Sequence, residues 1–127
     1  MLIWERFPGL TGLTLEADRP GAERVFRVRQ GKLVDSTLEF CPQILSRSNP
    51  DFDQQQQLLS PQYTERLTEG SEVPSDVASA LLSLALQHTF CGRFDKALHY
   101  LNLWPRDTGN PNTSRSRVKK AFGESIK

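Results

Sequence analysis

The chain has 127 residues, of which 37% are hydrophobic and 24% are charged, and its formal net charge is +1. This length suits one domain with a single modest core. No apolar run reaches the roughly 18 residues of a membrane-spanning helix, and the first residues lack the basic-then-apolar pattern of a secretory signal. We therefore expect a cytoplasmic protein that binds no membrane.

Residues 1–42 have the pattern of antiparallel β structure. From Phe26 to Arg29, apolar and charged residues alternate, which is typical of a strand with one buried face. A second strand is expected over residues 33–40, after a turn at Gly31. Because a two-stranded hairpin is marginal on its own, we expect either a third strand around Leu13 or helices that cover the hairpin.

The middle of the chain, residues 43–74, is polar and rich in turn signals. One short helix is expected to begin at Ser60 and Pro61, since Ser caps helix starts and Pro fits the first helical position. The glutamine run that begins at Gln54 is expected in a loop or on a solvated helix face.

Residues 75–105 are expected to form two helices that fold back on each other at Gly92. Apolar residues recur at helical spacing on both sides of this glycine. Glycine readily adopts the left-handed conformation that ends a helix, and Pro105 ends the second helix. The apolar positions are Val77, Leu81, Leu84 and Ala85 in the first helix and Phe94, Ala97, Leu98, Leu101 and Trp104 in the second.

This hairpin resembles one tetratricopeptide repeat over about residues 78–104. The resemblance implies a packing or protein-interaction role rather than catalysis, with small alanines at the helix contact and Phe94 plugging the open end. The pattern departs from the family at His88, Trp104 and Pro105, and no second copy is found, so a solenoid is not expected. The matching residues are Leu81, Leu84, Ala85, Gly92, Phe94, Asp95 and Ala97.

Residues able to do chemistry gather only around the same turn. A zinc site needs about four converging ligands, and the reversal at Gly92 separates His88 and Cys91 from His99. We expect no metal, no cofactor and a non-enzymatic role. His88 is expected to be a partly exposed polar residue. Cys41 and Cys91 are expected to be unpaired thiols in a reducing compartment, and a single disulfide between them is the alternative.

Residues 106–127 form a basic tail, with six basic residues against two acidic ones, while the rest of the chain is acidic. Such asymmetry is typical of contact with an acidic surface. Basic side chains also neutralise nucleic-acid phosphates without reading sequence. A solvated, flexible terminus is the plain structural interpretation.

The sequence thus predicts one α+β domain, in which an N-terminal antiparallel β-meander packs on a C-terminal αα-hairpin. We expect a small protein-interaction module that binds stoichiometrically, such as an adaptor, a secretion-type chaperone or a toxin-immunity protein. The alternative is a nucleic-acid-binding accessory protein that uses the basic tail. The expected contact residues are exposed aromatic and charged side chains: Trp4, Phe7, Tyr63, Tyr100, Trp104, Arg115, Arg117, Lys119 and Lys120.

Overall fold

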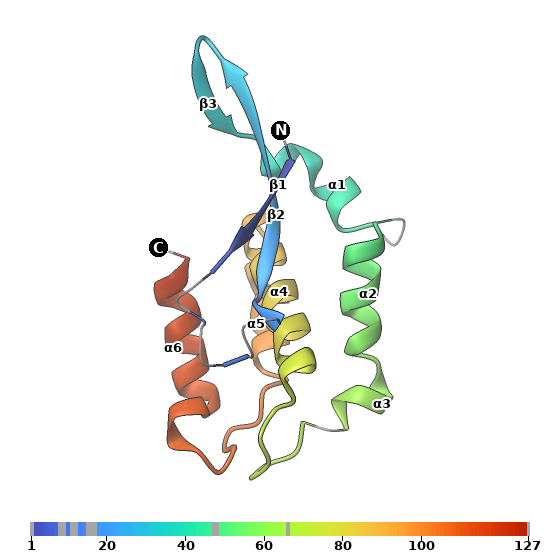
Figure 1. The fold of residues 1–127 in the computed structure, drawn as a ribbon, viewed down its shortest axis with the longest axis vertical. Coiled ribbons are helices and arrows are strands. Elements are labelled where there is room, and N and C mark those ends of the chain that lie inside the picture. Colours follow the sequence, from blue (N-terminus) through green and yellow to red (C-terminus); the bar gives the residue numbers. More distant parts are fainter. Residues whose placement is uncertain are drawn as a thin grey trace.

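A computed structural model describes residues 2–7, 10, 13–14, 18–46, 49–65 and 67–126 (Figure 1). The three strands form one antiparallel sheet in the order β1 (Leu2–Arg6), β2 (Gly21–Arg29) and β3 (Lys32–Asp35). The α-helices are α1 (Cys41–Ile44), α2 (Pro50–Leu58), α3 (Pro61–Thr64), α4 (Ser75–Phe90), α5 (Phe94–Leu101) and α6 (Arg115–Ser125), and the 3₁₀ helices are η3 (Thr37–Phe40) and η4 (Pro111–Thr113).

The predicted α+β arrangement is confirmed. The sheet comes first in the chain, and the antiparallel helices α4 and α5 follow and form the expected hairpin (Figure 1). Helix α4 lies beside β2, while the far end of the β2–β3 hairpin projects beyond the helices. Within the described ranges, none of the helices combines the length and the apolar character needed to cross a membrane.

Of the two alternatives for the hairpin, helix α4 does lie against β2, whereas the expected strand around Leu13 is not found, because Leu13 lies in a bend and the third strand is β1. The expected length of the second strand is wrong. Strand β3 ends at Asp35, and the residues expected to extend it to Phe40 form η3. The Asp35 carboxylate accepts the backbone N–H of Thr37 at 2.9 Å, which fixes the tight turn into η3.

One side of β2 is closed by side chains rather than by a strand. The N–H groups of Gly21, Glu23 and Val25 all point to this side. They donate to side-chain oxygens of Ser83, Gln87 and Thr37 at 3.1, 2.8 and 3.1 Å. The Gln87 amide also donates to the Glu23 carbonyl at 3.1 Å, so helix α4 replaces a missing strand at this position.

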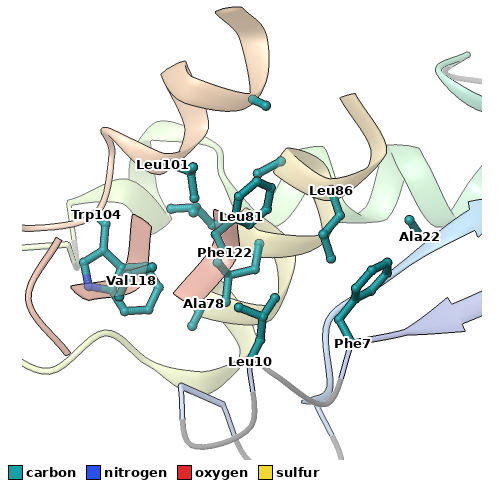
Figure 2. Packing of buried hydrophobic residues seen from close by; sticks show 13 residues of the cluster. Phe7, Leu10, Ala22, Ala78, Leu81, Leu86, Leu101, Trp104, Val118 and Phe122 are labelled. Atoms are coloured by element: carbon teal, nitrogen blue, oxygen red, sulfur yellow. The ribbon is translucent and has the colours of Figure 1, made fainter. Parts of the chain in front are cut away.

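The core lies between α4, α5, α6 and the start of the sheet (Figure 2). Helix α4 is buried on almost all sides, as its apolar sequence predicts. Trp104, a candidate contact residue that also belongs to the apolar stripe of the second helix, packs in the core: it is only 2% exposed, and its indole N–H donates to the Thr113 carbonyl at 2.8 Å. Helix α6 packs on the core through Val118 and Phe122, so the basic tail is an ordered helix over these residues.

The turn at Gly92 has the predicted left-handed conformation, with φ of 72°. Ala85 and Ala97 are buried where α4 and α5 meet, as expected for closely packed helices. Phe94 does not join them: its side chain is 67% exposed. The expectation that Phe94 plugs the hairpin is therefore wrong.

The two cysteines form a disulfide, Cys41–Cys91, with a Cα–Cα distance of 5.8 Å. The expectation of two unpaired thiols is wrong, because the fold places the start of α1 against the end of α4 although the two cysteines are 50 residues apart. The spacing of the two cysteines in the sequence does not show that they lie close together in the fold.

Candidate functional site

The outer edge of β1 is an unpaired sheet edge. Alternate residues of β2 direct their backbone N–H groups toward α4 and η3. The backbone groups of the intervening residues, Ala22 and Arg24, therefore point toward β1, where these residues lie opposite Glu5 and Ile3. Opposed residues of an antiparallel ladder exchange both hydrogen bonds or neither. The remaining residues of β1, which are Leu2, Trp4 and Arg6, therefore direct their backbone N–H and C=O groups outward. Among the described residues, nothing bonds to these groups.

The side chains of this edge are apolar and exposed. Leu2, Ile3 and Trp4 are 62%, 39% and 43% exposed. The Trp4 indole lies across Gly21, where an added Cβ would come within 2.5 Å of the ring nitrogen. The missing side chain at Gly21 thus gives Trp4 a fixed position on the sheet. We call Leu2–Arg6 with these features the β1 edge.

A groove of about 310 Å³ lies beside the β1 edge. Leu2 and Glu23 belong to the sheet face that also carries Trp4. The groove is lined on its other side by residues of η3, α1 and the start of α2. Its described lining is Leu2, Glu23, Phe40, Gln43, Ile44 and Asn49.

Arg24 fills the opposite sheet face. Its guanidinium contacts the carboxylates of Glu5 and Asp35 and lies 4.0 Å from the centre of the Phe90 ring. Burial would raise the pKa of Asp35, but hydrogen bonds from Thr37 and Arg24 outweigh this effect and lower that pKa below its ordinary value. Because Arg24 contacts Glu5, the Glu5 carboxylate is ion-paired within the sheet.

A second concave site has basic walls. Arg106, Arg115, Ser116 and Lys119 line a cavity of about 340 Å³ between the loop after α5 and the first two turns of α6. We call it the basic pocket. Two of the four basic residues that were predicted as contact residues in the tail, Arg115 and Lys119, line this pocket.

The other predicted contact residues are dispersed. Phe7 is buried and stacks on Phe90, so the expectation that it is exposed is wrong. Tyr100 is half-buried and stacks on His88. The side chain of Tyr63 lies outside the described part of the structure. Trp4, Arg117 and Lys120 are exposed as expected.

The side chains around Gly92 that were considered for metal binding or catalysis do not converge on one site. His88, expected to be partly exposed, is only 4% exposed and lies between the rings of Tyr100 and Phe52. The Cys91 sulfur is bonded to Cys41, so it is no thiolate for a metal or for nucleophilic attack. No group of three or more metal-ligating side chains occurs within the described ranges.

Sequence reasoning missed several residues of both sites. Leu2 and Ile3 stand directly before Trp4, and this apolar run is a signal for a strand. Arg106 and Ser116 carry no local signal, because only the fold brings the loop after α5 against α6. No protein-family model, no curated protein and no solved structure matches this chain, so its function is argued from these two sites.

Proposed function

We propose that the protein is a small interaction module that binds a partner protein stoichiometrically, by accepting an extended segment of the partner along the β1 edge. The observation that carries this proposal is the row of outward backbone groups at Leu2, Trp4 and Arg6, flanked by exposed apolar side chains. A partner strand would complete the ladder and cover Leu2, Ile3 and Trp4 together.

Open edges are normally protected, because unpaired N–H and C=O groups invite pairing with another chain. Protective devices are prolines, inward charges, bulges or covering elements. The β1 sequence LIWER contains no proline and no lysine, and Glu5 is held by Arg24. In strand addition, main-chain hydrogen bonds supply affinity and side-chain pockets supply specificity. The groove beside Leu2 is placed to take an apolar side chain of the partner.

The helical hairpin supports the edge indirectly. Helix α4 closes the other side of β2 through Ser83 and Gln87, which holds the strand that carries β1. The resemblance of α4 and α5 to a tetratricopeptide repeat agrees with an interaction role, and kinship with that family stays a prediction.

Nucleic-acid binding through the basic tail is the competing proposal, and the geometry favours it less. At 100° per residue, Arg117 points about 160° away from Lys119 around α6. The basic residues therefore do not form one track that a nucleic-acid backbone could follow.

The test uses the full chain as bait in an extract of its source, followed by amide hydrogen exchange on the isolated complex. Strand addition should slow the exchange of Leu2, Trp4 and Arg6, whereas Ile3 and Glu5 are already protected in the free protein. New protection that rises with the protein's own concentration would identify a second copy as the occupant. Uniform protection along β1, or none, would contradict strand addition.

Two substitutions of Trp4 distinguish the contribution of its backbone N–H to partner binding from that of its side chain. Trp4→Ala removes the ring only and should weaken partner binding. Trp4→Pro also removes an outward N–H that the sheet does not use, and it should abolish binding while β1 stays paired. The matched control is Phe94→Ala, which removes an exposed aromatic side chain on α5 instead. If this control weakens binding as much as Trp4→Ala, the contact surface is elsewhere.

The compartment is a separate proposal. Disulfides persist in oxidising compartments and are rare in the cytosol. The Cys41–Cys91 bond therefore favours an oxidising compartment over the cytoplasm that we expected. Alkylation of the protein at the moment of cell lysis should find both cysteines unreactive, and two reactive thiols would restore the cytoplasmic expectation.

A further inference from the structure

The basic pocket is a concave site that the β1 edge does not involve. Three of its four described lining side chains are cationic: Arg106, Arg115 and Lys119. The fourth, Ser116, offers a hydroxyl donor. The volume of about 340 Å³ lies near the lower end of the range typical of small-molecule sites, about 300–1,000 Å³.

The walls of the pocket are held by the core. Trp104 is buried, and its carbonyl accepts the Nε–H of Arg115 at 2.5 Å. The Arg115 N–H donates to the Arg106 carbonyl at 3.4 Å, which joins the loop to the start of α6. Buried Val118 and Phe122 fix the rotation of α6. The Arg115 guanidinium and the backbone of Arg106 are thus positioned before any ligand arrives, which lowers the entropic cost of binding.

The positive charge of the pocket is only partly offset by a nearby carboxylate, Glu69. In the described ranges, none of the three cations forms an ion pair with a carboxylate. Glu69 lies near, but its two oxygens accept the backbone N–H groups of Arg106 and Asp107 at 3.0 and 2.8 Å. These backbone hydrogen bonds lower the pKa of Glu69, and the charges of Arg115 and Arg106 add to the effect.

We propose that the basic pocket binds the phosphate group of a small phosphorylated molecule. Guanidinium, ammonium and hydroxyl groups together present several donors to a tetrahedral anion with multiple charged oxygens, and charge-assisted hydrogen bonds of this kind are strong. A phosphate dianion would also relieve the mutual repulsion of three like charges. The positive end of α6 adds to this field, but the side chains supply the charge.

A single phosphate group fits the geometry better than a nucleic-acid backbone. The pocket takes only two of the four basic residues of α6, and the exposed Arg117 points away from it. A polyanion would need the basic residues in one continuous stripe. This difference supplies the matched control, because Arg117 lies on the same helix and carries the same charge as the pocket residues.

The test is a titration of the full chain with inorganic phosphate and with glucose 6-phosphate, at constant ionic strength, followed by backbone amide NMR. Saturable shifts are expected at Arg106, Ser116 and Lys119. Tighter binding of the ester would show that the pocket also holds the group attached to the phosphate, and equal affinity would show that it holds phosphate alone. Shifts that stay linear up to high concentration, or that spread evenly over the surface, would overturn the proposal.

Substitutions decide whether the pocket is responsible. Lys119→Gln should weaken phosphate binding about tenfold, the loss expected for one charge-assisted hydrogen bond, and Lys119→Arg should retain most of the affinity. Arg117→Gln should leave the affinity unchanged. Equal losses in Lys119→Gln and Arg117→Gln would overturn the proposal, as would a single-stranded oligonucleotide that binds more tightly than the phosphates and depends on both residues. Circular dichroism of each variant confirms that the fold is retained.

Discussion

His88 is a titratable group placed where its charged form is disfavoured. Its ring is almost fully buried and stacks on Tyr100, with a ring-centroid distance of 5.3 Å, and the edge of Phe52 lies nearby. Neither ring nitrogen has a hydrogen-bond partner within the described residues. Burial lowers the pKa of His88 to about 4, and the charges of Arg93 and Lys96 add to this effect against an opposing one from Asp95.

The consequence is a loss of stability in acid. An unfolded histidine takes up a proton near pH 6.5, whereas the folded protein excludes this proton until the pH approaches 4. The contribution of neutral His88 to the free energy of unfolding is therefore fully present above pH 6.5. It is lost as the pH falls toward 4, and the total loss is about 3 kcal/mol. Urea unfolding of the wild type at a series of pH values between 7 and 4 should show this decline.

The chain offers a matched control for His88, because its other histidine, His99, is exposed on α5. His88→Phe should flatten the decline between about pH 6.5 and pH 4, while His99→Gln should retain it. A parallel decline in wild type and His88→Phe would show that carboxylates, and not His88, cause the acid sensitivity.

At the scale of single elements, the seating of β1 on β2 depends on the absence of a side chain at Gly21. An added Cβ would lie 2.7 Å from the Glu5 carbonyl oxygen and closer still to the Trp4 ring. Gly21→Ala should therefore destabilise the protein by about 1–3 kcal/mol and loosen β1. Gly123→Ala is the control, since nothing lies within 4 Å of that position on α6, and it should stabilise the helix by about 0.5–1 kcal/mol. Thermal unfolding measures both changes, and equal effects would refute the close approach.

One side-chain amide of α4 makes two of the hydrogen bonds that join this helix to β2. Gln87 satisfies both the N–H and the C=O of Glu23, as a neighbouring strand would. Gln87→Leu removes both of these hydrogen bonds and should cost about 2–4 kcal/mol. Gln54→Leu changes an exposed glutamine on α2 and should cost less than about 0.5 kcal/mol. Similar losses in the two variants, measured by urea unfolding, would show that Glu23 finds another partner.

The elements that could be predicted are those with local signals. The helices α4 and α5 follow from apolar periodicity, the glycine stop and Pro105, all within one stretch of chain. Strand β1 was missed because five residues give a weak alternation and its partner, β2, begins many residues later. Phe94 and His88 were misplaced for a related reason: spacing gives the face of a helix but not which neighbour covers it.

The candidate sites depend still more on distant contacts. Trp4, Arg115 and Lys119 were selected by residue type, which is a fair guide to binding. Neither the open edge beside Trp4 nor the convergence of Arg106 with α6 has a signal in the sequence, since both arise from pairing and packing across the fold. Phe7 and Trp104 show the cost of relying on type alone, because both lie in the core.

At the scale of the whole molecule, the disulfide connects the part of the chain after the sheet to the helical hairpin. Cys41 begins α1 and Cys91 follows α4. The bond closes a loop over a sequence separation of 50 residues. Cross-linking such a loop restricts the unfolded chain, and the loop-entropy relation gives about 4 kcal/mol of stabilisation for this length.

The protein should therefore unfold at markedly lower urea concentration when the bond is removed. The comparison is the wild type against Cys41→Ala/Cys91→Ala, both with and without a reducing agent. Reductant should lower the stability of the wild type by up to about 4 kcal/mol and leave the double variant unchanged. Because α4 also supports β2 through Gln87, amide exchange in β1 and β2 should rise in the double variant. A variant as stable as the wild type, with unchanged exchange, would show that the helical packing alone holds α1 against α4.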